Sequence, residues 1–164
     1  MTETGFEARD PAYEARIRGS FARQQFMATI GAVLDVVLPG FCEISARHDP
    51  GLTQQHGFFH GGLIGTLADT AAGYAAYTLM AADSSVLSIE YKINFMAPAH
   101  GERLIARGRV IRPGRQIHVA RADVFAVEEG VEKQVSTATV TLICLAGRDD
   151  FPQDQAAEKK ETRS

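Results

Sequence analysis

The chain has 164 residues, of which 45% are hydrophobic and 23% charged, and its formal net charge is −3 at pH 7. This length fits one globular domain, and the slightly acidic balance gives no basic field for nucleic acid or for an anionic membrane surface. Since no apolar run of about 18 residues and no signal peptide is found, we expect a cytoplasmic protein whose Cys42 and Cys144 are core residues rather than functional thiols.

The first 25 residues predict a helical extension. Apolar side chains recur at short steps among charges over residues 11–30, which is typical of an amphipathic helix that packs across one edge of a core. Pro11 suits the first turn of such a helix. We expect residues 26–147 to form the main domain and residues 148–164, charged and without apolar periodicity, to form a disordered tail.

The middle of the chain predicts two strands and then a long helix. The strand-like runs Ala32–Leu38 and Phe41–Arg47 flank Pro39-Gly40, a pair typical of a tight turn. Residues 61–82 are rich in Ala and Leu and apolar nearly all round, which indicates a buried helix. Four more strands are expected after it, at 86–95, 104–111, 117–127 and 135–145.

This order of elements predicts an α+β fold. We expect a curved antiparallel sheet of about five to six strands wrapped around one long buried helix. One sheet cannot cover every side of such a helix, and an edge strand stays exposed. At least a homodimer is therefore expected.

A single carboxylate interrupts the long helix. Asp69 is the only charged residue between Leu63 and Ala82. Because an ionised side chain in apolar surroundings costs several kcal/mol unless it is partnered, Asp69 either makes a buried structural hydrogen bond or is kept for chemistry.

Gly61 and Gly62 open the same helix, where free backbone N–H groups and partial positive charge can polarise a thioester or ester carbonyl. The alternative is that the two glycines only permit a tight turn into the helix. Gly61 and Asp69 are separated by roughly 12 Å at a rise of about 1.5 Å per residue, which is too far for both to act on one carbonyl. The spacing therefore predicts a site shared between two antiparallel helices across a two-fold axis.

His60 precedes the glycines and either faces a ligand or braces the loop, and we favour bracing. It pairs with His56 at a spacing of four residues, but this pair lies in a glycine-containing loop and lacks the glutamate of a zinc-protease motif. We expect no metal site.

The motif His60-Gly61-Gly62, followed seven residues later by Asp69, resembles the hotdog-fold acyl-CoA thioesterases, specifically the PaaI-like family. The stretch 87–99 and Gly101-Glu102 strengthen the resemblance, which extends over about residues 26–145. It implies a hotdog fold and hydrolysis of acyl-CoA to free acid and CoA. It also implies that there is no metal or redox cofactor, that coenzyme A enters with the substrate, and that dimers or dimers of dimers form.

The resemblance also implies roles for particular residues. Asp69 would act as nucleophile or general base, while the Gly61 N–H of the partner subunit would polarise the carbonyl. Ser88 would orient the water, and Gln54 stands where relatives commonly carry Asn. The remaining candidates would bind substrate: Gly62 near the carbonyl, Lys92, Arg112 and Arg115 at the CoA phosphates, and Phe58, Phe59, Tyr74, Tyr77 and Met80 around the acyl group.

Two other functions stay open. One is a hotdog hydratase or dehydratase, although the chain has neither a Phe-Pro-Gly-His nor an Asn-Pro-X-His stretch. The other is a non-catalytic acyl-CoA sensor, which would not need Asp69. Such a sensor normally carries a DNA-binding segment, and residues 1–25 are too short and too weakly basic for a helix-turn-helix.

Overall fold

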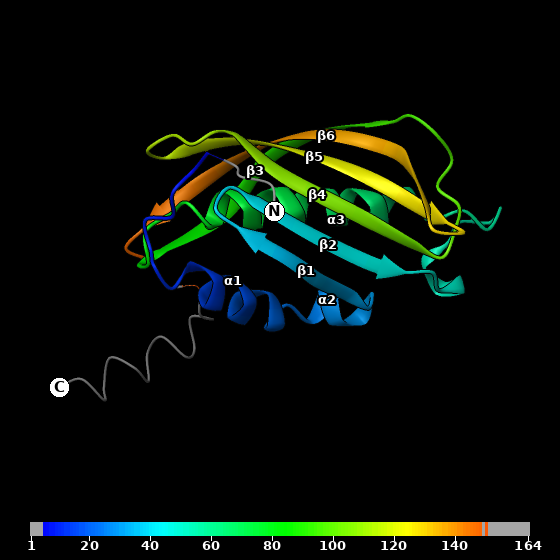
Figure 1. The fold of residues 1–164 in the computed structure, drawn as a ribbon, viewed down its shortest axis with the longest axis horizontal. Coiled ribbons are helices and arrows are strands. Elements are labelled where there is room, and N and C mark those ends of the chain that lie inside the picture. The colour runs from blue at the N-terminus through cyan, green and yellow to red at the C-terminus, as the bar shows by residue number, and fades with distance from the viewer. Residues whose placement is uncertain (1–4, 149, 151–164) are drawn as a thin grey trace.

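The computed structural model describes residues 5–148 and residue 150. Two short helices open the chain, one long helix lies in its middle, and six strands form a single sheet (Figure 1). The elements are α1 (Tyr13–Ala22), α2 (Gln25–Thr29), β1 (Ala32–Leu38), β2 (Phe41–Arg47), the 3₁₀ turn η1 (Pro50–Leu52), α3 (Gly61–Tyr77), β3 (Ser84–Phe95), β4 (Arg103–Arg112), β5 (Ile117–Glu128) and β6 (Val131–Ala146).

The sheet is antiparallel throughout, with the strand order β1-β2-β4-β5-β6-β3. It arches over α3, while α1 and α2 lie beside β1 (Figure 1). This arrangement confirms the predicted α+β hotdog fold. β3 follows α3 in the chain but pairs only with the last strand, so it forms one edge of the sheet.

The predicted strands β1 and β2 are found with the predicted bounds, and the turn between them is made by Pro39 and Gly40, with Gly40 at a φ of 73°. The single helix predicted over residues 11–30 is wrong. It is broken into α1 and α2 at Gln24, whose backbone is extended (φ −77°, ψ 98°). The side-chain amide of Gln24 donates to the Tyr74 hydroxyl at 2.8 Å, so a tertiary contact replaces the continuing helix.

Helix α3 ends at Tyr77, whereas the sequence predicted a helix to residue 82. Arg16 of α1 provides the reason, because its Nη2 donates to the carbonyl oxygens of Tyr77 at 3.3 Å and of Met80 at 3.0 Å. Its Nε binds Oδ2 of Asp10 at 2.8 Å, and its guanidinium lies 4.3 Å from the centroid of the Tyr77 ring. A cation thus satisfies the carbonyls at the carboxyl end of the helix, where the helix dipole favours positive charge.

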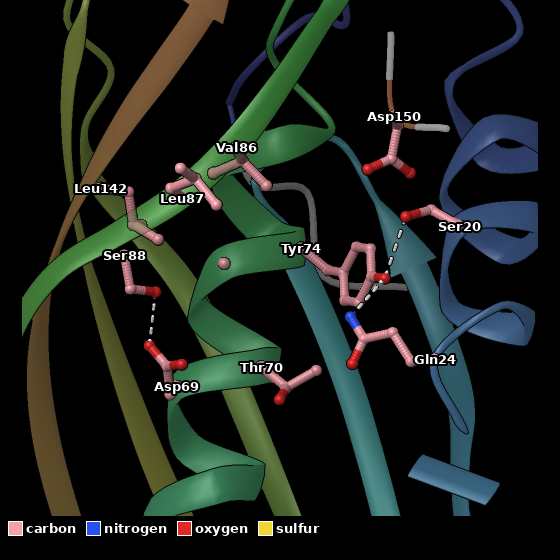
Figure 2. Close-up of a pocket in the computed structure, with 11 residues that line it drawn as sticks. Ser20, Gln24, Asp69, Thr70, Tyr74, Val86, Leu87, Ser88, Leu142 and Asp150 are labelled. Atoms are coloured by element: carbon pink, nitrogen blue, oxygen red, sulfur yellow. Dashed lines mark hydrogen bonds between the residues drawn. The ribbon is translucent and has the colours of Figure 1, made fainter. Parts of the chain in front are cut away.

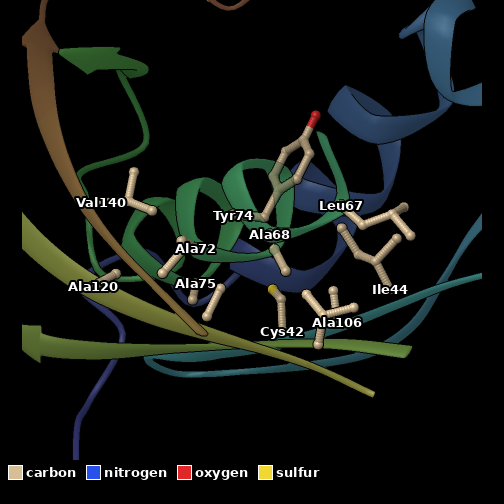
Figure 3. Close-up of a cluster of buried hydrophobic side chains, with 14 of the residues drawn as sticks. Cys42, Ile44, Leu67, Ala68, Ala72, Tyr74, Ala75, Ala106, Ala120 and Val140 are labelled. Carbon is tan, nitrogen blue, oxygen red and sulfur yellow. The ribbon is translucent and has the colours of Figure 1, made fainter. Parts of the chain in front are cut away.

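The core lies between α3 and the concave face of the sheet (Figure 3). Small residues allow the two layers to approach closely, and Gly108 of β4 is the tightest point. A Cβ atom at Gly108 would lie 2.2 Å from the carbonyl oxygen of Ala71 in α3, so no other residue fits there without a backbone shift.

Cys42 is fully buried in this core, and burial raises the pKa of its thiol. Cys144 is half-buried, and both cysteines are free.

Two further sequence predictions concern the C-terminal tail and membrane-spanning segments. Apart from Arg148 and Asp150, the predicted disordered tail lies outside the described residues. Within the described part of the chain, no helix is both long and apolar enough to span a membrane.

Candidate active site

Asp69 of α3 and Ser88 of β3 form a hydrogen-bonded pair at the side of α3 that the sheet leaves open. The Ser88 hydroxyl donates to Oδ1 of Asp69 at 2.7 Å. Burial raises the pKa of the Asp69 carboxyl, and the hydrogen bond from Ser88 lowers it in part. Desolvation disfavours the charged carboxylate, so Asp69 is a stronger base than an exposed aspartate.

The sequence of α3 explains this placement. Its residues that keep some exposure are Gly61, Gly62, Thr66, Asp69 and Thr70, while every other residue of the helix is buried. Positions 62, 66, 69 and 70 follow the i, i+4, i+7, i+8 spacing of one helix face. The helix is therefore not buried all round, as its composition suggested, but carries one polar stripe that the single chain leaves partly uncovered.

A groove of about 310 Å³ opens beside Asp69 (Figure 2). On one side lies β3, with Val86, Leu87 and Ser88, and on the other lies the N-terminal helical segment. α3 forms the floor between them, through Thr70, Gly73 and Tyr74. Ser20 of α1, Gln24 of the link between α1 and α2, Leu142 and Asp150 complete the lining.

The start of α3 is organised by His60, which acts as its N-cap residue. Nδ1 of His60 accepts the Gly62 N–H at 2.9 Å, and the His60 carbonyl accepts the N–H groups of Leu63 and Ile64. His60 thus braces the helix entry. The Gly62 N–H is engaged by this cap, which leaves Gly61 as the glycine of the pair whose N–H a substrate carbonyl can take.

Gly61 lies against the end of β3, since a Cβ atom placed on it would be 3.3 Å from Cζ of Phe95.

Gln54 remains in the loop before the helix, where its Oε1 accepts the His56 N–H at 2.7 Å. Within the described residues, no hydrogen bond joins Gln54 to Asp69 or Ser88. The structure therefore unites Asp69 with Ser88 but does not bring Gln54 to them.

The predicted acyl-contacting residues separate into two groups. Tyr74 lines the groove, whereas Phe58 is half-buried and packs edge-on against His100. Phe59 does not line this groove in the single chain, because it is 3% exposed and belongs to the core beside His48. Tyr77 and Met80 are also core residues rather than groove residues.

The three basic candidates for CoA binding are all exposed and none lines the groove. Lys92 lies on β3 and donates to Oδ1 of Asn94, Arg112 ends β4, and Arg115 lies in the turn between β4 and β5. Across residues 5–148 and 150, no group of three or more His, Cys, Asp or Glu side chains is arranged to hold a metal ion.

The sequence predicted Asp69, Tyr74 and Ser88 among the residues that line the groove but missed the others, and two of the missed residues, Ser20 and Gln24, are hydrogen-bonded to Tyr74. Both residues belong to the N-terminal segment and contact Tyr74 of α3, which follows Ser20 by 54 residues and Gln24 by 50 residues in the sequence. One signal was available: Ser20 follows Ile17 by one helical turn and therefore shares its buried face.

Comparisons with known proteins agree with this fold. Residues 56–133 match the family model of the thioesterase superfamily. The crystal structure of a thioesterase family protein from Silicibacter pomeroyi is 47% identical, with a TM-score of 0.81 over 82% of this chain and 99% of that one.

Two more distant structures share the fold. Thioesterase HI1161 of Haemophilus influenzae has a TM-score of 0.71 at 21% identity, over 79% of this chain and 88% of that one. The Escherichia coli PaaI protein from the phenylacetic acid degradation operon has a TM-score of 0.74 at 20% identity, over 83% and 95%. With this fold and the close similarity to the Silicibacter protein, the chain belongs to the thioesterase superfamily and is a hotdog-fold member of it.

Proposed function

We propose that the protein hydrolyses acyl-coenzyme A thioesters to a free acid and coenzyme A. The observation that carries this proposal is the pair formed by the half-buried Asp69 and the exposed Ser88, which opens onto the groove in a chain of the thioesterase superfamily. The groove supplies room for an acyl group next to a carboxylate of raised pKa.

The chemistry assigned to Asp69 follows from its two oxygens. Ser88 donates to Oδ1, which leaves Oδ2 to take a proton from a water molecule. The water oxygen then bonds to the thioester carbon, the carbon–sulfur bond breaks, and the CoA sulfur leaves with a proton. Alternatively, a carboxylate oxygen of Asp69 bonds to the carbon while the carbon–sulfur bond breaks and the CoA thiolate leaves, and water then hydrolyses the resulting anhydride to the free acid and the Asp69 carboxylate.

The proposed carbonyl-polarising group is the Gly61 N–H of a partner subunit. β3 is an edge strand, and large apolar side chains are exposed on it and directly after it, namely Leu87, Ile89, Tyr91, Phe95 and Met96, each 47–57% exposed in the single chain. An open edge with such side chains favours pairing with a second copy. A two-fold axis at this edge would set the open stripes of two α3 helices against each other in antiparallel orientation, with Gly61 of one chain near Asp69 of the other.

We assign the phosphates of coenzyme A to the exposed cations Lys92, Arg112 and Arg115, because phosphates favour Arg and Lys partners. In this proposal no metal or redox cofactor takes part, and coenzyme A arrives with the acyl group.

The test is release of free thiol from a panel of acyl-CoAs that spans acetyl, hexanoyl, decanoyl, palmitoyl, phenylacetyl and hydroxybenzoyl groups. Asp69→Asn is compared with wild type, and Asp83→Asn, a change in the exposed turn before β3, is the matched control. We expect turnover of some substrates by wild type and by the control, and a loss of at least about 100-fold in Asp69→Asn. Binding of acyl-CoA without turnover of any substrate would instead identify a sensor.

A further inference from the structure

The end of the groove away from Asp69 is lined by three polar side chains that are hydrogen-bonded to one another. The Tyr74 hydroxyl accepts the side-chain N–H of Gln24 at 2.8 Å and is hydrogen-bonded to the Ser20 hydroxyl at 3.0 Å. Figure 2 shows this cluster on the opposite side of α3 from Asp69 and Ser88, next to the N-terminal segment. The groove therefore has a catalytic end and a distal polar end.

Two of the three side chains of the distal cluster, Tyr74 and Ser20, are buried, whereas Gln24 is exposed in the single chain. The Tyr74 side chain is 4% exposed, and its ring packs against Phe21 with 5.9 Å between the ring centroids. Ser20 is also buried. Burial raises the pKa of Tyr74 to about 12, so the phenol stays protonated across the physiological range.

The cluster keeps hydrogen-bonding capacity after its internal bonds are made. Gln24 uses its amide nitrogen toward Tyr74, and among the described residues its Oε1 has no hydrogen-bond partner. A carbonyl oxygen of this kind accepts up to two hydrogen bonds. Asp150, whose carboxylate is paired with Arg23 at 2.9 Å, adds further acceptor oxygens to the lining. This end of the groove is thus rich in acceptors and suits a ligand that donates.

The stretch between the two ends is lined mainly by apolar residues, with Thr70 as its polar member. Val86, Leu87 and Leu142 line it, and Gly73 leaves it open because this residue has no side chain. A volume of about 310 Å³ lies at the small end of the range for ligand pockets, which is roughly 300–1,000 Å³. A long unbranched tail would have to run through the polar cluster and leave its acceptors without partners.

We propose that this groove selects short acyl groups whose distal end carries a hydroxyl, which donates to Oε1 of Gln24 beside Tyr74. This inference rests on the proposed thioesterase function and gives the N-terminal helical segment a part in substrate selection. A site built to hydrogen-bond a hydroxyl discriminates against the analogue that lacks it, because the polar groups of the site are then buried without partners.

The test uses ligands that cannot be hydrolysed, so it does not depend on turnover. The S-butyl, S-hexyl and S-octyl thioethers of coenzyme A are compared with their ω-hydroxy counterparts by isothermal titration calorimetry. We expect the hydroxyl to tighten binding to wild type about fivefold at the best-fitting length, the effect of one net hydrogen bond. Tyr74→Phe and Gln24→Leu should each reduce this ratio toward one, whereas Gln25→Leu, one residue further along and outside the groove lining, should retain it.

The possible outcomes distinguish a failure of this inference from a failure of the proposed thioesterase function. Equal affinity for the paired thioethers at every length, a preference that survives in both variants, or no binding of any thioether overturns the inference. A preference that depends on Tyr74 and Gln24 supports it even if no acyl-CoA is hydrolysed, and in that case only the hydrolytic function fails.

Discussion

Ser88 of the edge strand β3 donates its hydroxyl hydrogen to Oδ1 of Asp69 at 2.7 Å, which joins the strand to helix α3 at the mouth of the groove. Two influences therefore act in opposite directions on one carboxyl group. Burial raises the pKa of Asp69, and the Ser88 hydrogen bond lowers it. The pH at which the proposed base becomes active depends on this balance.

Replacing Ser88 with Ala should shift the acidic limb of the pH–rate profile toward higher pH. The substitution removes the interaction that lowers the pKa of Asp69 and leaves the burial that raises it. Because the carboxylate is the active form, kcat/KM falls as pH drops through this pKa. The measurement is kcat/KM against pH for wild type, Ser88→Ala and Ser85→Ala, the last being a control on the same strand outside the groove lining. A limb that stays in place or moves to lower pH would contradict the assignment.

Asp69→Asn should leave the protein as stable as wild type, or more stable, at pH 7. The pKa of Asp69 is raised in the folded state, so the stability contributed by its protonated form is present below the unfolded pKa and is lost as pH rises through the folded pKa. Asn carries no charge and can still accept from Ser88. Thermal unfolding should show a Tm difference at pH 7 that disappears below about pH 4. A lower Tm for the variant at pH 7 would reveal a structural role for the carboxylate.

Ile89→Glu should convert the proposed dimer into a monomer. Ile89 is 55% exposed in the single chain and lies on edge strand β3, where a charge opposes pairing with a second copy. Val131→Glu is the matched control, because Val131 is 68% exposed at the start of β6, which is not an edge strand. Size-exclusion chromatography with light scattering gives the mass of each variant. A wild-type monomer, or an Ile89→Glu dimer, would refute this interface.

A mixed dimer tests whether each site is shared between two chains. Gly61→Val should lower kcat at least tenfold, because the branched side chain crowds Phe95 and covers the N–H proposed to polarise the carbonyl. Asp69→Asn should also be inactive as a homodimer. A purified heterodimer of these two variants retains one intact pair, Asp69 of the first chain with Gly61 of the second, and should recover about half of the wild-type activity. If both groups of a site came from one chain, the heterodimer would be inactive.

Arg16→Met should lower the free energy of unfolding by about 3 kcal/mol, because it leaves Asp10 and the carbonyls of Tyr77 and Met80 without their shared partner. Arg121→Met is the control, since the Arg121 ion pair with Asp123 is exposed and should contribute no more than about 1 kcal/mol. Urea denaturation followed by circular dichroism measures both changes. Equal losses for the two variants would argue against the capping role of Arg16.

The sequence predicted those parts of the fold that local chemistry determines. Pro39-Gly40 fixes the turn between β1 and β2, and the glycines after His60 mark the start of α3. The breaks at Gln24 and after Tyr77 carry no glycine or proline signal, because tertiary contacts from Tyr74 and Arg16 create them. Composition alone could not show these contacts.

The candidate site was predicted in the same uneven way. Asp69 was predicted as a site residue because its charge is isolated within an apolar helix, and Ser88 was predicted from a family resemblance. Phe59 was predicted to contact the acyl group but lies in the core of the single chain, because an aromatic residue beside the motif does not reveal which way its ring turns. Ser20 was missed because the side of α1 that meets Tyr74 depends on how that helix docks.

The close approach of Gly108 in β4 to Ala71 in α3 sets the distance between the helix and the sheet. Any side chain at Gly108 would lift the middle of the helix, and Asp69 stands only two positions before the point of contact. Ser88 belongs to the edge strand β3, which β5 and β6 separate from β4, and it would not follow this movement. The buried Gly108 therefore helps to set the distance between the Asp69 carboxylate and Ser88, and the spacing between α3 and the sheet is part of the proposed catalytic geometry.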